Sequence, residues 1–415
     1  MDISTQIPRI ESWWTAHQER IEFLLRLGRA LHTYGSGAHR LEDVLAHVTE
    51  KLGLEGQFFS TPTSIFAAFG SQGEQRTHLI RVEPGEVNLG KLADLDEVVI
   101  EVLRTGLTPG AGSRRIDEIV DAPCRYNTAL DVASFGAISA TGAVFLGGGL
   151  KELLVSAVIG LAIGLVSLVM RRSGNLRRVF TAVAAFVASI LASLATIWIG
   201  GYSVFTATLA GLIVLLPGLN LTVAMRELST QHLASGTARL SGAFVVFLEL
   251  IFGVALGTRI AILLLDHIPV ARVVPLPAWA YLLALLVAPL ALTVRLRAHP
   301  RDAIWIVFAG VLAVAGTRIG SSLLDPELGV FFGAVTIGAA SNLYARIFNR
   351  PSLVTWVPGL LMLVPGSIGL RSLASLMDDR ILVGVETAFK MILIAIALVA
   401  GTLIANIILP PRKLR

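Results

Sequence analysis

Two short segments inside apolar stretches carry the same proline-glycine pair. Residues 211–222 read GLIVLLPGLNLT and residues 359–370 read GLLMLVPGSIGL, with 5 of 12 positions identical at a separation of 148. Proline removes a backbone donor and glycine lets the backbone leave helical geometry, so each pair predicts a broken helix. Matching broken helices in two halves of a membrane chain indicate the binding site of a carrier.

The breaks also define which chemistry such a site offers. A free helix N-terminus favours a carboxylate through its amides and dipole, and freed carbonyls suit an ammonium group. A zwitterionic amino acid matches both, and nearby hydroxyl and amide side chains suit a hydroxylated one. A proline kink that serves only helix packing is the alternative. The predicted substrate-binding residues are Pro217, Gly218, Asn220, Thr222, Pro365, Gly366, Ser367 and Asn342.

Two carboxylates are candidates for proton coupling. Glu249 lies near the centre of an apolar stretch, where an ionised carboxylate costs roughly 2.5–3.5 kcal/mol or more and is therefore usually functional. A structural pair with a buried arginine or hydroxyl is the alternative. Asp131, at the start of an earlier stretch, lines the cytoplasmic mouth or caps its helix.

Three further residues have two interpretations each. Arg226 and Glu227 follow the first break and are either a cytoplasmic gate pair or a solvated loop pair. Asn342, within the small-residue run GAASNLY, faces the transport pathway or packs against a neighbouring helix.

The sequence does not predict an enzyme, a metal site or a cofactor. Five of the eight histidines fall before residue 80, but their spacing matches no zinc signature. The single cysteine, Cys124, excludes a disulfide framework and any multi-cysteine metal site. Ser60, Ser64 and Ser71 lack a nucleophile-elbow setting.

The chain divides into two parts of different composition. Residues 1–125 have charges throughout and predict a cytoplasmic α+β domain with no signal peptide before it. Its predicted helices cover 19–34, 41–52 and 89–103, its strands 57–61, 64–69 and 77–82, and residues 107–115 predict a loop before a short helix.

Beyond residue 126 the chain is a series of apolar stretches near the ~20 residues that cross a bilayer as a helix. About ten transmembrane helices are expected, five in 126–270 and five in 271–415. The expected spans are 128–148, 152–170, 179–199, 203–225, 240–264, 277–295, 302–322, 328–347, 353–371 and 382–409.

Loop charge sets the expected orientation. Loops on the side of the first domain and the C-terminal tail hold 14 basic residues against 6 on the other side, which places both termini in the cytoplasm. This topology explains the net charge of +5 without nucleic acid. Trp198, Trp279, Trp305 and Trp356 fall near span ends, where aromatic belts form.

An odd number of spans per half requires two related halves to enter the membrane in opposite directions. A second match supports such a duplication: GVALGTRIA (253–261) and ALVAGTLIA (397–405) share 4 of 9 residues at a separation of 144. The fold class predicted is therefore an all-α membrane protein with an inverted 5+5 repeat behind the α+β domain.

The amphipathic segment LLRLGRALHTYGSGAHRLEDVLAHVTEKLGL, followed by FFSTPTSIFAAFG, resembles the threonine/serine exporter family. The resemblance covers nearly the whole chain. It implies a soluble N-terminal region before about ten spans, a bacterial inner-membrane location and export of threonine and serine driven by the proton motive force. Some relatives split this body into two proteins and are similar to dicarboxylate exporters, so succinate export is an alternative. A passive channel is another alternative. Assembly into a homo-oligomer is also possible on this basis.

Overall fold

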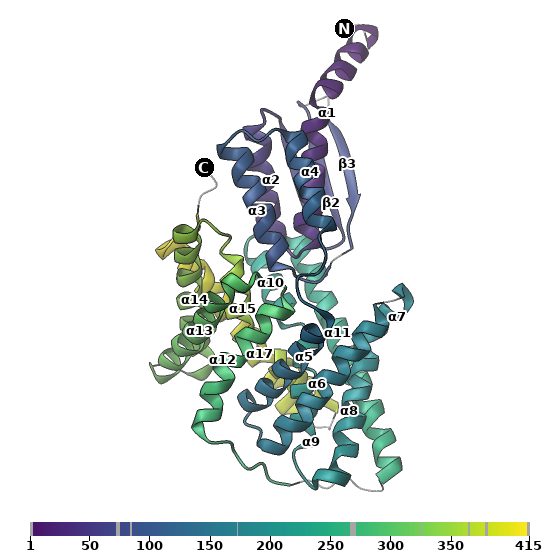
Figure 1. Ribbon diagram of the computed structural model, residues 1–415, viewed down its shortest axis with the longest axis vertical. Helices are drawn as coiled ribbons and strands as arrows, with labels where there is room; N and C mark the ends of the chain where they lie inside the picture. Colours follow the sequence, from purple (N-terminus) through teal and green to yellow (C-terminus); the bar gives the residue numbers. More distant parts are fainter. Residues whose placement is uncertain are drawn as a thin grey trace.

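The computed structural model describes residues 3–71, 75–83, 85–171, 173–265, 271–323, 325–363, 366–377 and 381–412. An N-terminal head stands on one end of a long helical body (Figure 1), and Arg412, the last described residue, lies against the head. The boundary expected at 270/271 lies outside the described residues.

The head is an α+β domain, as its sequence pattern predicts. Its elements are α1 (Ile3–Thr33), α2 (Ala38–Lys51), β1 (Gly56–Thr61), β2 (Ser64–Phe69), β3 (Arg76–Arg81), α3 (Leu89–Arg104) and α4 (Pro109–Asp121). The strands form an antiparallel sheet in the order β1-β2-β3. Alternate β2 residues Ile65, Ala67 and Phe69 are buried in a core shared with the helices.

The loop expected at 107–115 is wrong, because α4 begins at Pro109. The Thr108 side chain accepts a hydrogen bond from the Ala111 amide and so caps the helix, with proline in its first turn. The glycines that suggested a loop instead allow close packing on α1. A methyl group built on Gly112 would lie 2.6 Å from the Phe23 ring.

The body consists of helices that match the expected spans closely. They are α5 (Thr128–Phe145), α6 (Leu150–Met170), α7 (Gly174–Arg178), α8 (Phe180–Ile199), α9 (Val204–Gly211), η1 (Ile213–Leu215), α10 (Gly218–Ser229), α11 (Leu233–Leu265), α12 (Ala278–Arg295), η2 (Pro300–Asp302), α13 (Ala303–Leu323), α14 (Pro326–Phe348), α15 (Leu353–Leu361), α16 (Gly366–Met377) and α17 (Ile381–Ile408). Among the described residues, nine segments are long and apolar enough to cross a membrane. The pair 204–211 and 213–229, bent by 47° at its break, is the tenth if it forms one span. The chain is a multi-pass membrane protein.

The two halves of the body pack their helices in the same pattern. In each half the third span packs on the fifth (α8 on α11, α14 on α17), and the second part of the broken span packs on the fifth (α10 on α11, α16 on α17). Between the halves, α5 packs on α12, while α10 meets α17 and α16 meets α11. Every contact in this set has its counterpart when the halves are exchanged.

The second sequence match falls at equivalent places in this pattern. Gly257 of α11 lies against α8, where a methyl group would come within 2.8 Å of the Phe186 carbonyl oxygen. Gly401 of α17 lies against α14, and a methyl group there would come within 2.5 Å of the Phe331 carbonyl oxygen. The aligned glycines therefore allow the same close approach between the third and fifth spans of each half.

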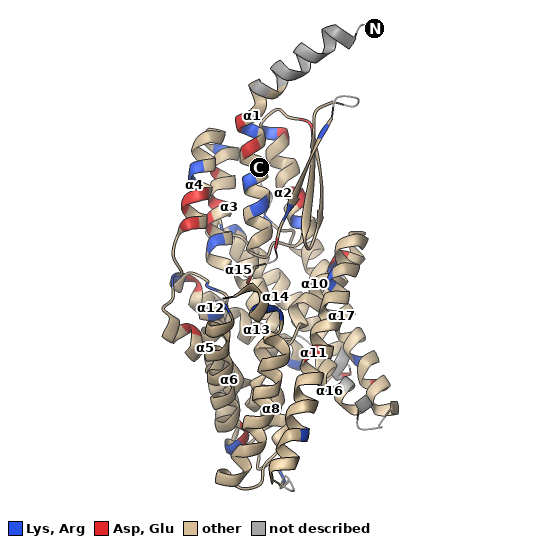
Figure 2. Cartoon of the chain, turned by 90° about the vertical axis from the view of Figure 1, so that its right-hand side faces the viewer, with Lys and Arg blue, Asp and Glu red and all other residues tan. Residues whose placement is uncertain are grey.

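Ion pairs join the head to the body, and many of the Lys, Arg, Asp and Glu residues lie in the head and at its junction with the body (Figure 2). Glu86 of the head pairs with Arg171 at 3.0 Å, with Arg295 at 3.1 Å and with Arg297 at 2.9 Å. Burial opposes ionisation of Glu86, but the three guanidinium groups outweigh it and lower the pKa of the carboxyl. Arg412 of the C-terminal tail pairs with Asp96 of α3 at 2.9 Å. The tail and the head thus lie on the same side of the body, as an even number of crossings requires.

Candidate functional site

The two broken helices meet at their breaks. A methyl group built on Gly366 would lie 3.0 Å from Cβ of Leu216 and 3.6 Å from the backbone nitrogen and Cα of Gly218. A side chain at position 366 would therefore crowd Leu216, while the Gly218 backbone would lie at ordinary contact distance. The sequence repeat therefore marks two points that touch in space, although they lie 148 residues apart.

The polar residues predicted around the breaks differ in what they contact. Thr222 is buried, and its hydroxyl donates to the Gly218 carbonyl oxygen at 3.1 Å. Ser367 is half-buried and Asn220 is exposed. Pro365 lies outside the described residues.

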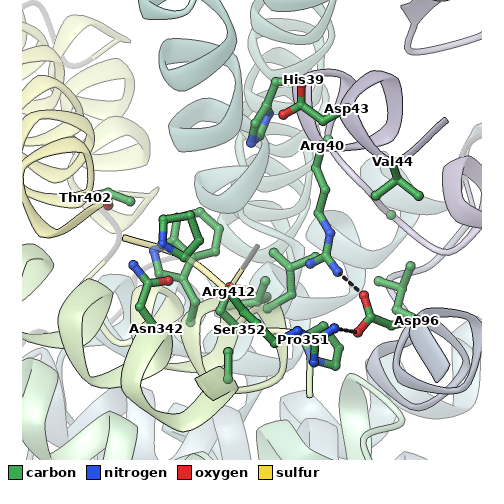
Figure 3. Close-up of a pocket in the computed structure, with 18 of the residues that line it drawn as sticks. His39, Arg40, Asp43, Val44, Asp96, Asn342, Pro351, Ser352, Thr402 and Arg412 are labelled. Atoms are coloured by element: carbon green, nitrogen blue, oxygen red, sulfur yellow. Dashed lines mark hydrogen bonds and ion pairs between the residues drawn. The ribbon is translucent and has the colours of Figure 1, made fainter. Parts of the chain in front are cut away.

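A cavity of about 630 Å³ lies between part of the head and the body (Figure 3). Its volume is within the usual range of small-molecule sites. Its walls come from α2 and α3 of the head, from α10 and α15 beside the breaks, and from α14 and α17. The lining residues recur three or four positions apart on each helix, for example Leu219, Val223 and Arg226 on α10, so each helix turns one face inward. The cavity thus adjoins the head-side parts of both broken helices.

Arg226 is the unpaired cation of this cavity. Its guanidinium carbon lies 5.2 Å from the ring centroid of Trp356, within range of a cation–π contact. Its Nε is buried without a hydrogen-bond partner, and no carboxylate in the described part of the chain pairs with it. The residue as a whole is half-buried, and the planar donors of its guanidinium match a carboxylate.

The other three arginines of the cavity are already paired. Arg40 and Arg412 share Asp96, at 3.0 and 2.9 Å, as the dashed lines in Figure 3 show. Arg350 pairs at 3.0 Å with Asp302, which is not a lining residue. An incoming anion therefore finds its strongest free partner at Arg226.

Three more nitrogen atoms facing this region are buried without hydrogen bonds: Nδ1 of His39, Nε1 of Trp356 and one terminal nitrogen of Arg412. Burial, followed by the nearby Arg226, His232, Arg40 and Arg239, lowers the pKa of His39 to about 2. The imidazole is therefore neutral at physiological pH. The cavity offers donors and positive charge, which is the chemistry of an anion-binding site.

Glu227 does not pair with its neighbour Arg226, which corrects both interpretations of this pair. Its fully buried carboxylate binds Arg239 through two hydrogen bonds of 3.1 and 3.2 Å and accepts another from the Ser235 hydroxyl at 2.9 Å. It also accepts the backbone N–H of Ala38 at 3.1 Å, at the start of head helix α2. Glu227 therefore fixes the head to the body, while Arg226 faces the cavity.

Asn342 lines the cavity and is nearly fully buried. Its side-chain amide donates to Asn406 Oδ1 and to the Leu409 carbonyl oxygen, both at 2.8 Å. These bonds join α14 to the end of α17, so Asn342 packs against a neighbouring helix and also lines the cavity.

The two proton-coupling candidates lie away from the cavity. Asp131 pairs with Arg171 at 3.2 Å beside a small pocket under the head, and Asn127 rather than Asp131 caps α5. Glu249 is half-buried on α11 and forms no ion pair or hydrogen bond with any residue that the structure describes.

Sequence reasoning missed most of the cavity. Trp356 was expected in an aromatic belt, but it is 6% exposed and lies under Arg226, whereas Trp198 and Trp279 are largely exposed, as a belt requires. His39, Arg40 and Asp43 of the head were not predicted as site residues at all. Their spacing on α2 places them on one helix face, but nothing local shows that this face meets the body.

Comparisons with known proteins agree with this architecture. A family model for threonine/serine exporters matches residues 22–261, and a second model, described as threonine/serine exporter, ThrE, matches residues 281–408. The boundary between them falls between α11 and α12, where the two halves of the body meet. No solved structure matches the chain.

Several fungal proteins are similar over most of the chain. The pheromone-regulated membrane protein 10 of Candida albicans (strain SC5314) is 27% identical over 376 residues, which cover 85% of this chain and 33% of the relative. The protein of that name from Yarrowia lipolytica is 26% identical over 394 residues, 88% of this chain and 31% of the relative. The chain thus spans about a third of the length of these relatives. Because the first family model alone covers more than half of it, the chain belongs to the threonine/serine exporter family.

Proposed function

We propose that this protein is a secondary active transporter that exports threonine and serine through a plasma membrane. Substrate enters from the head side into the cavity between the head and the body. It then passes the crossing of the two broken helices as the halves of the body alternate between an inward-open and an outward-open arrangement.

The observation that carries this proposal is the unpaired Arg226 stacked on Trp356. These two residues come from α10 and α15, the head-side parts of the two broken helices. An amino acid whose carboxylate binds Arg226 therefore contacts both broken helices at once. Binding energy gained at this place favours one arrangement of the halves, which is what coupling of binding to a conformational change requires.

The packing of the body supports an inverted repeat whose two halves move against each other during transport. The contacts of α10 with α17 and of α16 with α11 exchange when the halves are exchanged, and the breaks meet where a two-fold axis would pass between Gly218 and Gly366. Two halves related in this way can rock about that crossing and expose it to either side.

The proposed orientation in the membrane rests on the charge of the loops, and the proposed driving force is proton entry. The arginine-rich loops lie on the side of the head, which favours a cytoplasmic head and tail, as in a bacterial inner membrane. Proton entry supplies about 2.3 kcal/mol per charge per 100 mV. Glu249 is the proposed proton carrier, because its carboxylate lies within the membrane span without a partner among the described residues.

Export of dicarboxylates such as succinate is the second candidate. Four arginines and two aspartates line the cavity, so positive charge is in excess there. A dianion would use this excess more fully than a zwitterion.

Counterflow in proteoliposomes tests the proposal. Unlabelled threonine trapped inside should drive transient accumulation of labelled threonine, which a passive channel or a membrane-bound enzyme would not produce. Arg226→Gln should reduce this accumulation at least tenfold, since a hydrogen bond to a charged group contributes about 1.5–3 kcal/mol. Arg177→Gln, which removes an exposed arginine far from the cavity, is the matched control. Accumulation of labelled succinate but not threonine would replace the first candidate by the second.

Proton coupling is tested separately. Glu249→Gln should leave counterflow intact and remove the effect of an imposed pH gradient on net export. An unchanged response to the gradient would exclude Glu249 from this role.

A further inference from the structure

Head helix α2 contributes an acidic side chain to the same cavity. Asp43 lines the cavity one turn after His39, on the face of α2 that is turned toward the body (Figure 3). No cation in the described ranges forms an ion pair with it or donates a hydrogen bond to its carboxylate. Asp96, the other aspartate of the cavity, is fully used by Arg40 and Arg412.

Asp43 and Arg226 therefore form the free opposite charges of one cavity. They come from the head and from the broken span α10, and the distance between them exceeds the 4.0 Å of a direct ion pair. Asp43 is nevertheless near enough to be among the charged groups that act on the Arg226 guanidinium. Two unpaired charges held apart in this way match the two charges of an α-amino acid, because its carboxylate and its ammonium are opposite in sign and each needs its own partner.

We propose that Asp43 binds the ammonium group of the substrate and thereby selects amino acids against dicarboxylates. The inference rests on the proposed function, and it makes the head part of the substrate site. Without the Asp43 charge, the free groups of the cavity are donors and cations, a set that favours a dianion. With it, Arg226 and Asp43 balance each other, and a second carboxylate on the ligand would meet a negative charge.

The test compares ligand affinities of the purified full-length protein in nanodiscs, measured by calorimetry with L-threonine and with succinate. Asp43→Asn should weaken threonine binding at least tenfold and leave succinate binding equal or stronger, because only the ammonium group loses its partner. Asp43→Glu, which keeps the charge, should retain threonine binding better than Asp43→Asn. Glu50→Gln, the same kind of change on an exposed position of α2 outside the cavity, should alter neither affinity.

A ligand-side measurement keeps the test valid if a variant does not fold. The unaltered protein should bind 2,3-dihydroxybutyrate, in which a hydroxyl replaces the ammonium group of threonine, at least tenfold more weakly than threonine. Unchanged threonine affinity in a folded Asp43→Asn variant, or equal binding of the two ligands, would overturn the role of Asp43 and leave the exporter proposal intact. Failure of the unaltered protein to bind threonine or serine would instead overturn the exporter proposal itself.

Discussion

Replacing Glu227 by glutamine should loosen the junction between the head and the body. The buried carboxylate accepts four hydrogen bonds, two from Arg239 and one each from Ser235 and the Ala38 backbone. A glutamine amide has one acceptor oxygen in place of two, so it can keep only one of the two neutral donors, which now use different oxygens. It also leaves the Arg239 guanidinium, whose side chain is 21% exposed, without its counter-charge. Breaking a buried pair in this way costs about 3–5 kcal/mol.

The free energy of unfolding in a denaturant titration measures this loss, and hydrogen exchange at the start of α2 locates it. Arg177→Gln is the matched control, because the ion pair of Arg177 with Glu83 also joins head and body but is largely exposed and should contribute at most about 1 kcal/mol.

A double-mutant cycle then separates the two possible partners of Glu227. The coupling energy of Glu227 with Arg239 should clearly exceed its coupling with Arg226. A loss below about 1 kcal/mol for Glu227→Gln, or a larger coupling with Arg226, would refute the assigned geometry.

Two further changes test the cavity and the crossing. Because the lowered pKa of His39 means that only the unfolded chain takes up this proton below about pH 6.5, His39 should destabilise the fold as the pH falls, by up to about 1.4 kcal/mol per pH unit. His39→Gln should flatten the stability profile between pH 6.5 and 5 in thermal unfolding, and an identical slope in both proteins would contradict a neutral His39. Gly366→Val should separate the two backbones and abolish counterflow, whereas Gly242→Val, in open space on α11, should be tolerated; full activity of the first variant would show that the crossing is not needed.

Most of the body was predictable because each membrane span can be recognised from its own residues. Apolar length and flanking charge define the helices, and the two proline-glycine pairs define the breaks. Glu386 and Lys390, four residues apart on α17, form an ion pair of 2.9 Å. Such features depend on residues that are close in the sequence.

The cavity was not predictable for the opposite reason. Ala38 and Glu227, which join head and body, are 189 positions apart, and Trp356 meets Arg226 from a different half of the body. A tryptophan near a span end is consistent with both an interfacial and a buried position, and only the arrangement of the halves decides between them. The family resemblance predicted the architecture without identifying any of these contacts.

The ion pairs of Glu86 link the head to both halves of the body, which bears on the proposed movement of one half against the other. Arg171 follows α6 in one half of the body, whereas Arg295 and Arg297 belong to the end of α12 in the other, so a single carboxylate bridges both halves. Relative rotation of the halves must either carry the head along or stretch at least one of these three contacts. Because partly exposed ion pairs weaken as ionic strength rises, the proposed alternation between two arrangements of the halves should be sensitive to salt on the head side of the membrane.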